Sequence, residues 1–80
     1  MQLHRTKWTN RGLKIVLLSH GMAGTSIDIA KMLGLEKKQA LDRWNGGRFT
    51  REEMVLIRDI LDLSSDEFIT AFFYELKGCN

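Results

Sequence analysis

The side chains best suited to chemistry lie close together in one stretch of the chain, residues 37–48. They carry ammonium, amide and carboxylate groups: Lys37, Lys38, Gln39, Asp42 and Asn45. At about 100° per residue, Lys38, Asp42 and Asn45 point to one side of a helix, with Lys37 and Gln39 beside them. Such groups donate and accept hydrogen bonds. The stretch therefore predicts a helix that presents a polar row to a partner.

Two uses of this row stay open for Lys38 and Asp42. The residues stand four apart, so on a helix they can form an ion pair with each other at the surface. They can equally contact the partner directly.

The opposite side of the same helix is expected to pack on the body of the domain. Ala40 and Trp44 lie there, with Leu41 near the edge. We therefore interpret Trp44 as a core residue rather than a platform for stacking a base. A helix held from behind in this way, with its N-terminal polar side chains pointing outward, has the shape to enter a DNA major groove about 12 Å wide.

The remaining polar residues do not predict catalysis. His4 and His20 are far apart and lack acidic neighbours at ligand spacing, and Ser64 and Ser65 are more simply helix caps than nucleophiles. No catalytic triad, carboxylate pair or phosphate-binding loop is present in the sequence. We expect no enzymatic activity, no metal and no cofactor.

The elements that position the polar row are expected to be helices within one domain, residues 1–80. Apolar residues recur at spacings of three and four, and proline is absent, so the sequence predicts an all-α fold of five helices. Residues 1–9 are expected to form a mobile basic arm. Thr9 and Asn10 then cap a first helix that runs to about His20. Its buried side is expected to hold Leu13, Val16, Leu17 and Leu18.

A sharp corner joins the second and third helices. Thr25 and Ser26 start the second helix, which ends at Gly34. Its apolar residues are Ile29, Ala30, Met32 and Leu33. Glycine at 34 allows the left-handed turn, and the small Ala30 lets the two axes approach closely. The third helix runs from Lys37 to Trp44 and stops at Asn45, Gly46 and Gly47. Residues 25–46 therefore predict a helix-turn-helix.

Two capping boxes start the last two helices. Thr50 with Glu53 opens the fourth, and Ser64 with Glu67 opens the fifth, residues 64–77, which Gly78 closes. The expected inward residues of the fourth are Met54, Ile57, Ile60 and Leu61. The fifth carries Phe68, Ile69, Phe72, Phe73, Tyr74 and Leu76, more apolar residues than one buried face needs. They either complete the core or meet a second copy of the chain, with Phe68, Phe72, Phe73 and Leu76 as the dimer contacts.

Charge divides the chain into two unequal halves. Residues 1–48 hold nine Lys or Arg and three Asp or Glu, a balance of +6, whereas residues 49–80 hold three and seven, a balance of −4. This asymmetry predicts that one face meets a polyanion and the other does not. The single Cys79 excludes an internal disulfide; it is either a reduced thiol or a site of intermolecular pairing. Neither a membrane-length apolar run nor a signal-peptide pattern is present, so we expect a soluble intracellular protein.

Residues 25–50 resemble the helix-turn-helix of the Cro and lambda-repressor-like (XRE) family of phage and bacterial regulators. Family sequences commonly combine Thr-Gln-x-Glu-Leu-Ala, Leu-Gly-Ile-Ser, a recognition helix and Asn-Gly. The corresponding segments here are TSIDIA at 25–30, LGLE at 33–36 and NG at 45–46. The resemblance covers roughly residues 11–76. It implies a compact five-helix DNA-binding domain that reads an operator in double-stranded DNA and is encoded by a phage or mobile element. The resemblance also implies a location in the bacterial cytoplasm or nucleoid.

The resemblance also implies roles for single residues. Thr25 and Ser26 would bind a phosphate at the start of the second helix. Lys37 and Lys38 would reach guanine edges, and Asp42 would accept a hydrogen bond from a cytosine amino group. Asn45 would contact the backbone, and Gln39 belongs to the same DNA-binding set. The charge and position of Arg43 and Arg48 assign both arginines to phosphates. A homodimer would place two reading helices about 34 Å apart on an inverted repeat.

A second function is compatible with the same fold. Glu36 and Asp42 place negative charges on the expected reading helix, and the C-terminal half of the chain is acidic. These charges are consistent with an antirepressor or modulator that binds a partner repressor instead of DNA. The operator sequence and the choice between activation and repression do not follow from the residues.

Overall fold

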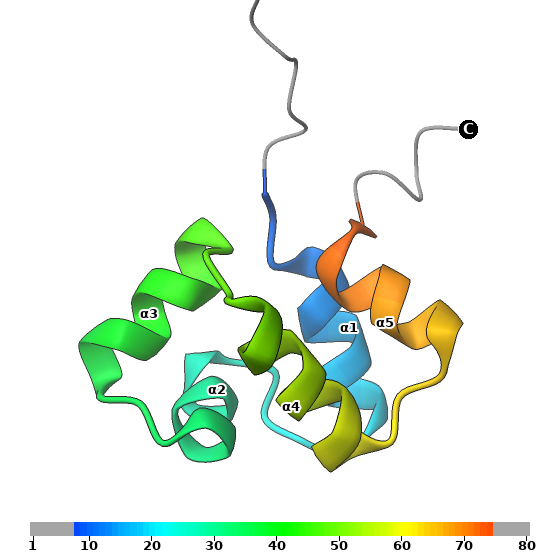
Figure 1. Ribbon diagram of the computed structural model, residues 1–80, viewed down its shortest axis with the longest axis horizontal. Helices are drawn as coiled ribbons and strands as arrows, with labels where there is room; N and C mark the ends of the chain where they lie inside the picture. The colour runs from blue at the N-terminus through cyan, green and yellow to red at the C-terminus, as the bar shows by residue number, and fades with distance from the viewer. Residues whose placement is uncertain (1–7, 75–80) are drawn as a thin grey trace, which may run out of the picture.

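Five helices make up the part of the chain that the structure describes, as the sequence predicts. The computed structural model describes residues 8–74, and within them there is no strand. The helices are α1 Arg11–Ser19, α2 Ser26–Leu33, α3 Lys37–Gly46, α4 Arg51–Leu61 and α5 Ser65–Phe72 (Figure 1). In the part of the chain described, no helix combines the length and apolar character needed to cross a membrane.

The two predicted capping boxes are present, and they fix where α4 and α5 begin. The Thr50 hydroxyl accepts the Glu53 N–H at 3.1 Å, and the Glu53 carboxylate accepts the Thr50 N–H at 2.9 Å. Ser64 and Glu67 exchange the same two bonds at 3.1 and 3.0 Å. Each box satisfies amides that the first turn of a helix leaves without partners.

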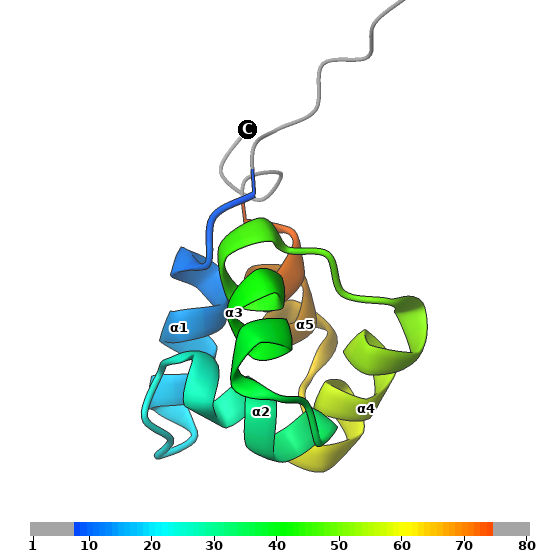
Figure 2. The same ribbon diagram turned by 90° about the vertical axis from the view of Figure 1, so that its left-hand side faces the viewer.

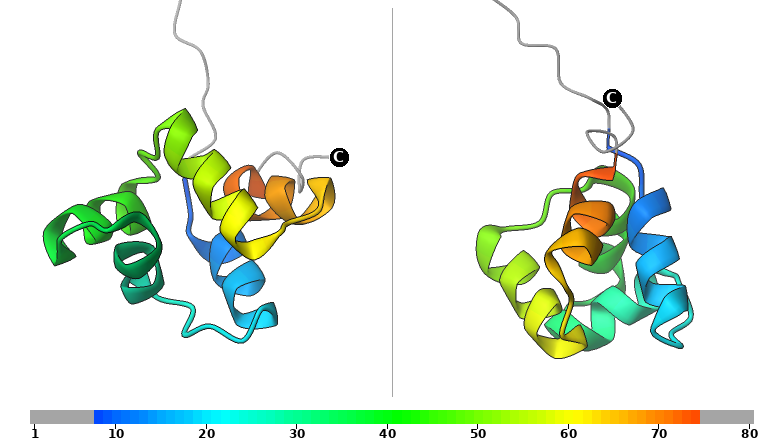
Figure 3. Two further views of the ribbon diagram at one scale, coloured as in Figure 1. Left: turned by 60° about the horizontal axis from the view of Figure 1, so that its bottom comes forward. Right: turned by 90° about the vertical axis from the view of Figure 1, so that its right-hand side faces the viewer.

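The core lies where α1, α4 and α5 meet α2 and α3. Its buried side chains are Leu13, Val16, Leu17, Ile29, Ala40, Ile57, Leu63, Ala71 and Phe72. Helix α1 packs closely on α5. The absence of a side chain at Gly12 allows this approach, since a Cβ there would collide with the carbonyl oxygen of Thr70. Seen from below, α2 and α3 form a pair on one side of α1, α4 and α5 (Figure 3).

Four details of the predicted helices are wrong. Helix α3 continues through Asn45 to Gly46, and Gly47 takes the left-handed conformation that ends it, with φ of 68°. Leu18 is half exposed and lies against Gly24 rather than in the core. Ile60 is 49% exposed, because the inward stripe of α4 is set by Ile57 and its neighbours. Helix α5 ends at Phe72, and residues 75–80, with Leu76, Gly78 and Cys79, lie outside the described residues.

The corner between α2 and α3 has the predicted geometry. Gly34 ends α2 in the left-handed conformation, with φ of 65°, and its N–H bonds to the carbonyl of Ala30. The Leu35 N–H bonds to the same carbonyl at 3.0 Å, and the Leu35 side chain packs against the core. The chain therefore turns within two residues, and α3 lies directly against α2.

Candidate nucleic-acid interface

Helix α3 lies at one side of the molecule (Figure 2), and the side chains of the predicted polar row are exposed. The exposed residues of the row are Lys37, Lys38, Gln39, Asp42 and Asn45. Ala40 is buried and Trp44 is partly buried against the core, so the predicted division of the helix into two sides is confirmed. Leu41 is the exception: it is 37% exposed and lies on the outer side rather than packing on the body.

The two lysines at the start of α3 have no ionic partner among residues 8–74. None of the ion pairs among residues 8–74 includes Lys37 or Lys38, so the ion pair between Lys38 and Asp42 is not formed. The cation nearest to Asp42 is Arg43, with 3.9 Å between Asp42 Oδ2 and Arg43 Nη1. Of the two open alternatives, the structure leaves Lys38 available for a partner.

Gln39 has a local role that the sequence interpretation missed. Its Oε1 accepts the backbone N–H of Glu36 at 3.0 Å, which caps the start of α3. The pattern of an N-cap residue followed three positions later by Gln is a capping signal, and Glu36 and Gln39 fit it. The bond holds the side-chain amide of Gln39 beside the first turn of the helix, close to the two lysines.

Arg43 is engaged inside the molecule, contrary to its predicted phosphate contact. Its Nε and Nη2 donate to the two carboxylate oxygens of Glu53 at 3.2 and 3.0 Å. The Arg43 and Glu53 side chains are only 20% and 16% exposed. The bidentate pair therefore ties α3 to the first turn of α4 and removes Arg43 from the set of free cations.

The pair shifts the pKa of both groups. The hydrogen bond that Arg43 donates to Glu53 raises the pKa of Arg43 above its ordinary value. Burial alone would raise the pKa of Glu53, but the bonds from Arg43 and Thr50 outweigh burial and hold the pKa below its usual range. Both groups are therefore charged at neutral pH.

The start of α2, where Thr25 and Ser26 are predicted to bind a phosphate, already contains a carboxylate. Asp28 is 4% exposed, and its oxygens accept the N–H groups of Ala23, Gly24 and Thr25 at 3.3, 2.7 and 3.3 Å. The Thr25 hydroxyl accepts the Ile27 N–H at 3.3 Å. A phosphate at this end would therefore rely on the side chains of Thr25 and Ser26 and on amides that Asp28 leaves open.

The C-terminal end of α3 is held by the segment before α1. The Nε1 of Trp8 and the Nδ2 of Asn10 both donate to the carbonyl oxygen of Trp44, at 3.0 and 3.2 Å. Asn10 precedes α1 as predicted, but its side chain makes no cap for that helix. Residues 1–7 of the predicted arm lie outside the described residues, whereas Trp8 is packed. The signal in the sequence that could have predicted this packing is a lone tryptophan, Trp8, in an otherwise polar segment.

Arg48 follows the glycine that ends α3 and is exposed. It lies near Gly46 at the end of the helix, where its guanidinium remains a candidate for a phosphate contact.

The predicted dimer residues do not form one exposed patch. Phe72 is 6% exposed and belongs to the core, where Phe49 and Phe68 each place a ring centroid 5.2 Å from its own. The prediction of Phe72 as a dimer contact is therefore wrong, because the ring closes the core beneath α5. Phe68 is partly buried, Phe73 is exposed, and Leu76 lies outside the described residues.

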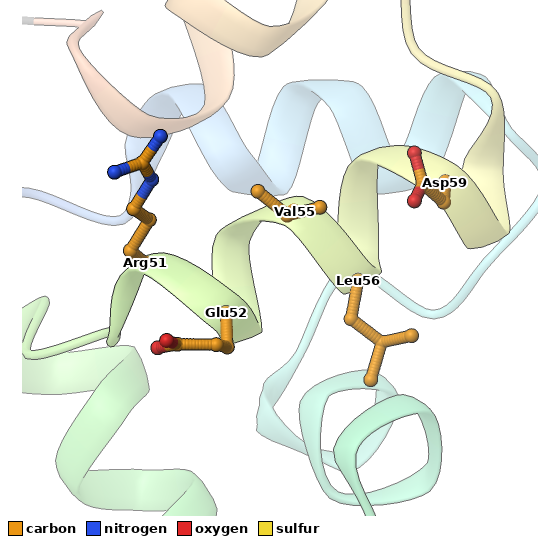
Figure 4. A pocket seen from close by; sticks show the side chains of 5 residues that line it. All are labelled: Arg51, Glu52, Val55, Leu56 and Asp59. Carbon is orange, nitrogen blue, oxygen red and sulfur yellow. The ribbon is translucent and has the colours of Figure 1, made fainter.

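A second surface lies on the outer face of α4. A hollow there is lined by Arg51, Glu52, Val55, Leu56 and Asp59 (Figure 4). All five side chains come from one helix, and Arg51 and Leu56 point away from each other across the face. Among residues 8–74 no group of three His, Cys, Asp or Glu is arranged to hold a metal ion.

Comparison with known proteins gives no relative for this chain. No protein-family model, no curated protein and no solved structure matches it.

Proposed function

We propose that this chain is a sequence-specific DNA-binding transcription regulator that reads the major groove with α3. The observation that carries the proposal is the contrast between the two sides of α3. Lys37 and Lys38 are exposed and form no ion pair with any other described residue, while Ala40 and Trp44 pack the opposite side of the helix against the core. The sharp corner at Gly34 supports a helix-turn-helix of the Cro and lambda-repressor-like kind.

The side chains in this arrangement suit different parts of a duplex. The ammonium groups of Lys37 and Lys38 donate to guanine O6 and N7, and the Asp42 carboxylate accepts from a cytosine amino group. Asn45 and Arg48, near the end of α3, suit the backbone. Thr25 and Ser26 suit a phosphate at the start of α2. Arg43 is left out of this set because Glu53 holds its guanidinium.

Selection from a random duplex pool tests the proposal. The protein is expected to enrich one sequence, and the logarithm of its affinity is expected to fall steeply and linearly with the logarithm of salt concentration. Two half-sites about one helical turn apart would indicate the homodimer, which stays a prediction. Failure to enrich any sequence at low salt, or affinity that salt does not change, would refute DNA binding.

A protein-binding function is the second candidate, and the outer face of α4 favours it. Val55 and the exposed Leu56 form an apolar strip that Glu52 and Asp59 flank (Figure 4). Such a strip suits a partner repressor with a basic, partly apolar surface. Co-purification with a second regulator, together with no affinity for any duplex, would select this antirepressor function over the first.

A further inference from the structure

Helix α3 is attached to the domain in an unusual way for a helix that must hold a fixed position. Ala40 is its only fully buried side chain, and its principal helical neighbour is α2 (Figure 1). The ties to the other parts of the domain are largely polar. One is the bidentate pair between Arg43 and Glu53, and the other is at the Trp44 carbonyl.

The carbonyl of Trp44 is a natural place to hold the helix. It lies in the last turn of α3, where carbonyl oxygens have no amide partner within the helix and carry the negative end of the helix dipole. The indole N–H of Trp8 and the amide of Asn10 both donate to this oxygen, at 3.0 and 3.2 Å. Two donors on one terminal carbonyl fix the direction of the helix end as well as its distance.

The indole of Trp8 is seated as closely as its ring allows. A Cβ at Gly47 would overlap the Trp8 ring, and the left-handed φ of 68° at Gly47 also favours glycine. The centroid of the Trp8 ring lies 6.0 Å from that of Phe49. The Phe49 centroid in turn lies 5.2 Å from that of Phe72 in the core. The indole that donates to α3 is therefore connected to the core through the rings of Phe49 and Phe72.

Asn10 gives up a favourable local bond to reach α3. Asparagine is among the best N-cap residues, yet its side chain caps nothing in α1. The same amide instead bonds across 34 positions in the sequence. Because Asn10 makes this bond instead of capping α1, its bond to the Trp44 carbonyl is the one that matters for the structure.

We propose that Trp8 and Asn10 are positioning residues, a clamp that sets how α3 is presented to DNA. The inference depends on the proposed DNA-binding function. Neither side chain needs to touch a base. The clamp limits the tilt of α3 in the free protein, so α3 loses less conformational entropy when it enters the groove.

Two variants remove the donors, one with an aromatic ring still present at position 8 and one with the side-chain size unchanged at position 10. Trp8→Phe keeps a ring against Gly47 and Phe49 but has no N–H. Asn10→Asp is isosteric and an equally good residue before α1, but it turns a carboxylate oxygen toward the Trp44 carbonyl. Ser19→Ala is the matched control, because it removes one side-chain bond to a backbone carbonyl, Ser19 to Val16 at 2.7 Å, away from α3.

Hydrogen exchange tests the clamp without DNA. The reporter is the Gly47 N–H, which bonds to the Arg43 carbonyl at 2.7 Å in the last turn of α3. Each variant is expected to speed its exchange by about 2- to 10-fold, the usual range for one lost hydrogen bond, with the α1 amides unchanged. Equal acceleration in every helix would show a general loss of stability and would overturn the clamp. Ser19→Ala should leave the Gly47 amide unchanged.

Affinity for the duplex that the wild-type chain selects tests the positioning role. The double variant is expected to bind it about tenfold more weakly while its circular dichroism stays helical. If the wild-type chain binds this duplex and the double variant binds equally well, the inference fails and the proposed function stands. If the wild-type chain selects no duplex, the proposed function itself fails, and the clamp loses its role in DNA binding.

Discussion

The outer faces of α3 and α4 are both rich in charge, but the charges are arranged differently on the two helices. On α4, Arg51 and Arg58 stand with Glu52 and Asp59, and Arg58 Nη2 lies 3.1 Å from Asp59 Oδ1. At the start of α3, Lys37 and Lys38 have no such partner within residues 8–74. A polyanion gains little from a surface that already neutralises itself. Two adjacent cations that form no ion pair within residues 8–74, rather than the number of cations, distinguish the candidate reading helix.

The two helices also differ in how they are held. Helix α4 is anchored by a stripe of apolar side chains around the buried Ile57, whereas α3 depends on one buried alanine, a partly buried tryptophan and polar ties. Apolar burial tolerates small changes of angle, but bidentate and convergent hydrogen bonds do not. The difference suits a helix whose exact presentation matters.

Removal of the unpaired cations is expected to have the largest effect. Lys37→Ala combined with Lys38→Ala should weaken binding to the selected duplex by about 100-fold and abolish the sequence preference, since each base contact contributes about 1–3 kcal/mol. Competition with unrelated duplex measures the preference. The matched control is Arg51→Ala with Arg58→Ala, which removes the same charge from α4 and should change affinity only a few-fold. Equal losses in both doubles would mean that net charge alone drives binding.

The glycine that ends α3 is expected to give the largest loss of stability. Gly47→Ala forces a left-handed residue, which costs about 1–2 kcal/mol, and pushes its Cβ into the Trp8 ring. Gly34→Ala has a similar φ but meets nothing within 4 Å, so it should cost only the backbone term. Urea unfolding compares the two free energies. A Gly34 variant as unstable as the Gly47 variant would show that the close approach of Trp8 adds nothing.

The ion pair between Arg43 and Glu53 predicts a pH dependence of stability. Because the folded pKa of Glu53 is lowered, its contribution is complete above the pKa of the unfolded chain, about 4.3, and is lost as pH falls through the lower folded value. Glu53→Gln should lower the melting temperature at pH 7 by less than Gly47→Ala, and the difference from wild type should narrow toward low pH. Glu52→Gln, on the exposed face of α4, is the control. A difference that stays constant with pH would exclude the ion pair as its cause.

Local signals in the sequence were sufficient for the helices but not for the ties between them. Capping boxes at Thr50 and Ser64, and glycines at the ends of α2 and α3, act within a few residues, so their effect can be predicted from the chain alone. The outward row of α3 followed from helical periodicity for the same reason.

Long-range partners could not be predicted in this way. Arg43 was assigned to a phosphate from its charge, although Glu53, ten residues on, holds it. Asn10 was assigned to a cap, although Trp44 receives its amide. Phe72 was assigned to a dimer because the aromatic residues of α5 exceed one face, yet Phe49, from the connection after α3, draws that ring into the core. Each choice depends on which helices meet, and a single sequence does not specify that.

A substitution at the C-terminal end of α4 is expected to have the smallest effect on stability. It tests a further difference between α4 and α3. Asp62 ends α4 in the left-handed conformation, with φ of 53°, the position that Gly47 fills in α3. Asp62→Gly should therefore stabilise the protein by about 0.5–1 kcal/mol, because relief of the backbone strain exceeds the extra entropy of glycine in the unfolded chain. Asp62→Asn keeps the side-chain shape and removes only the negative charge beside the end of the helix dipole. Thermal unfolding of both variants distinguishes the two causes. An equal gain of stability in Asp62→Asn would show that the charge of Asp62 destabilises the protein. A gain confined to Asp62→Gly would show that the backbone conformation does so, and that α4 tolerates a strained end that α3 avoids.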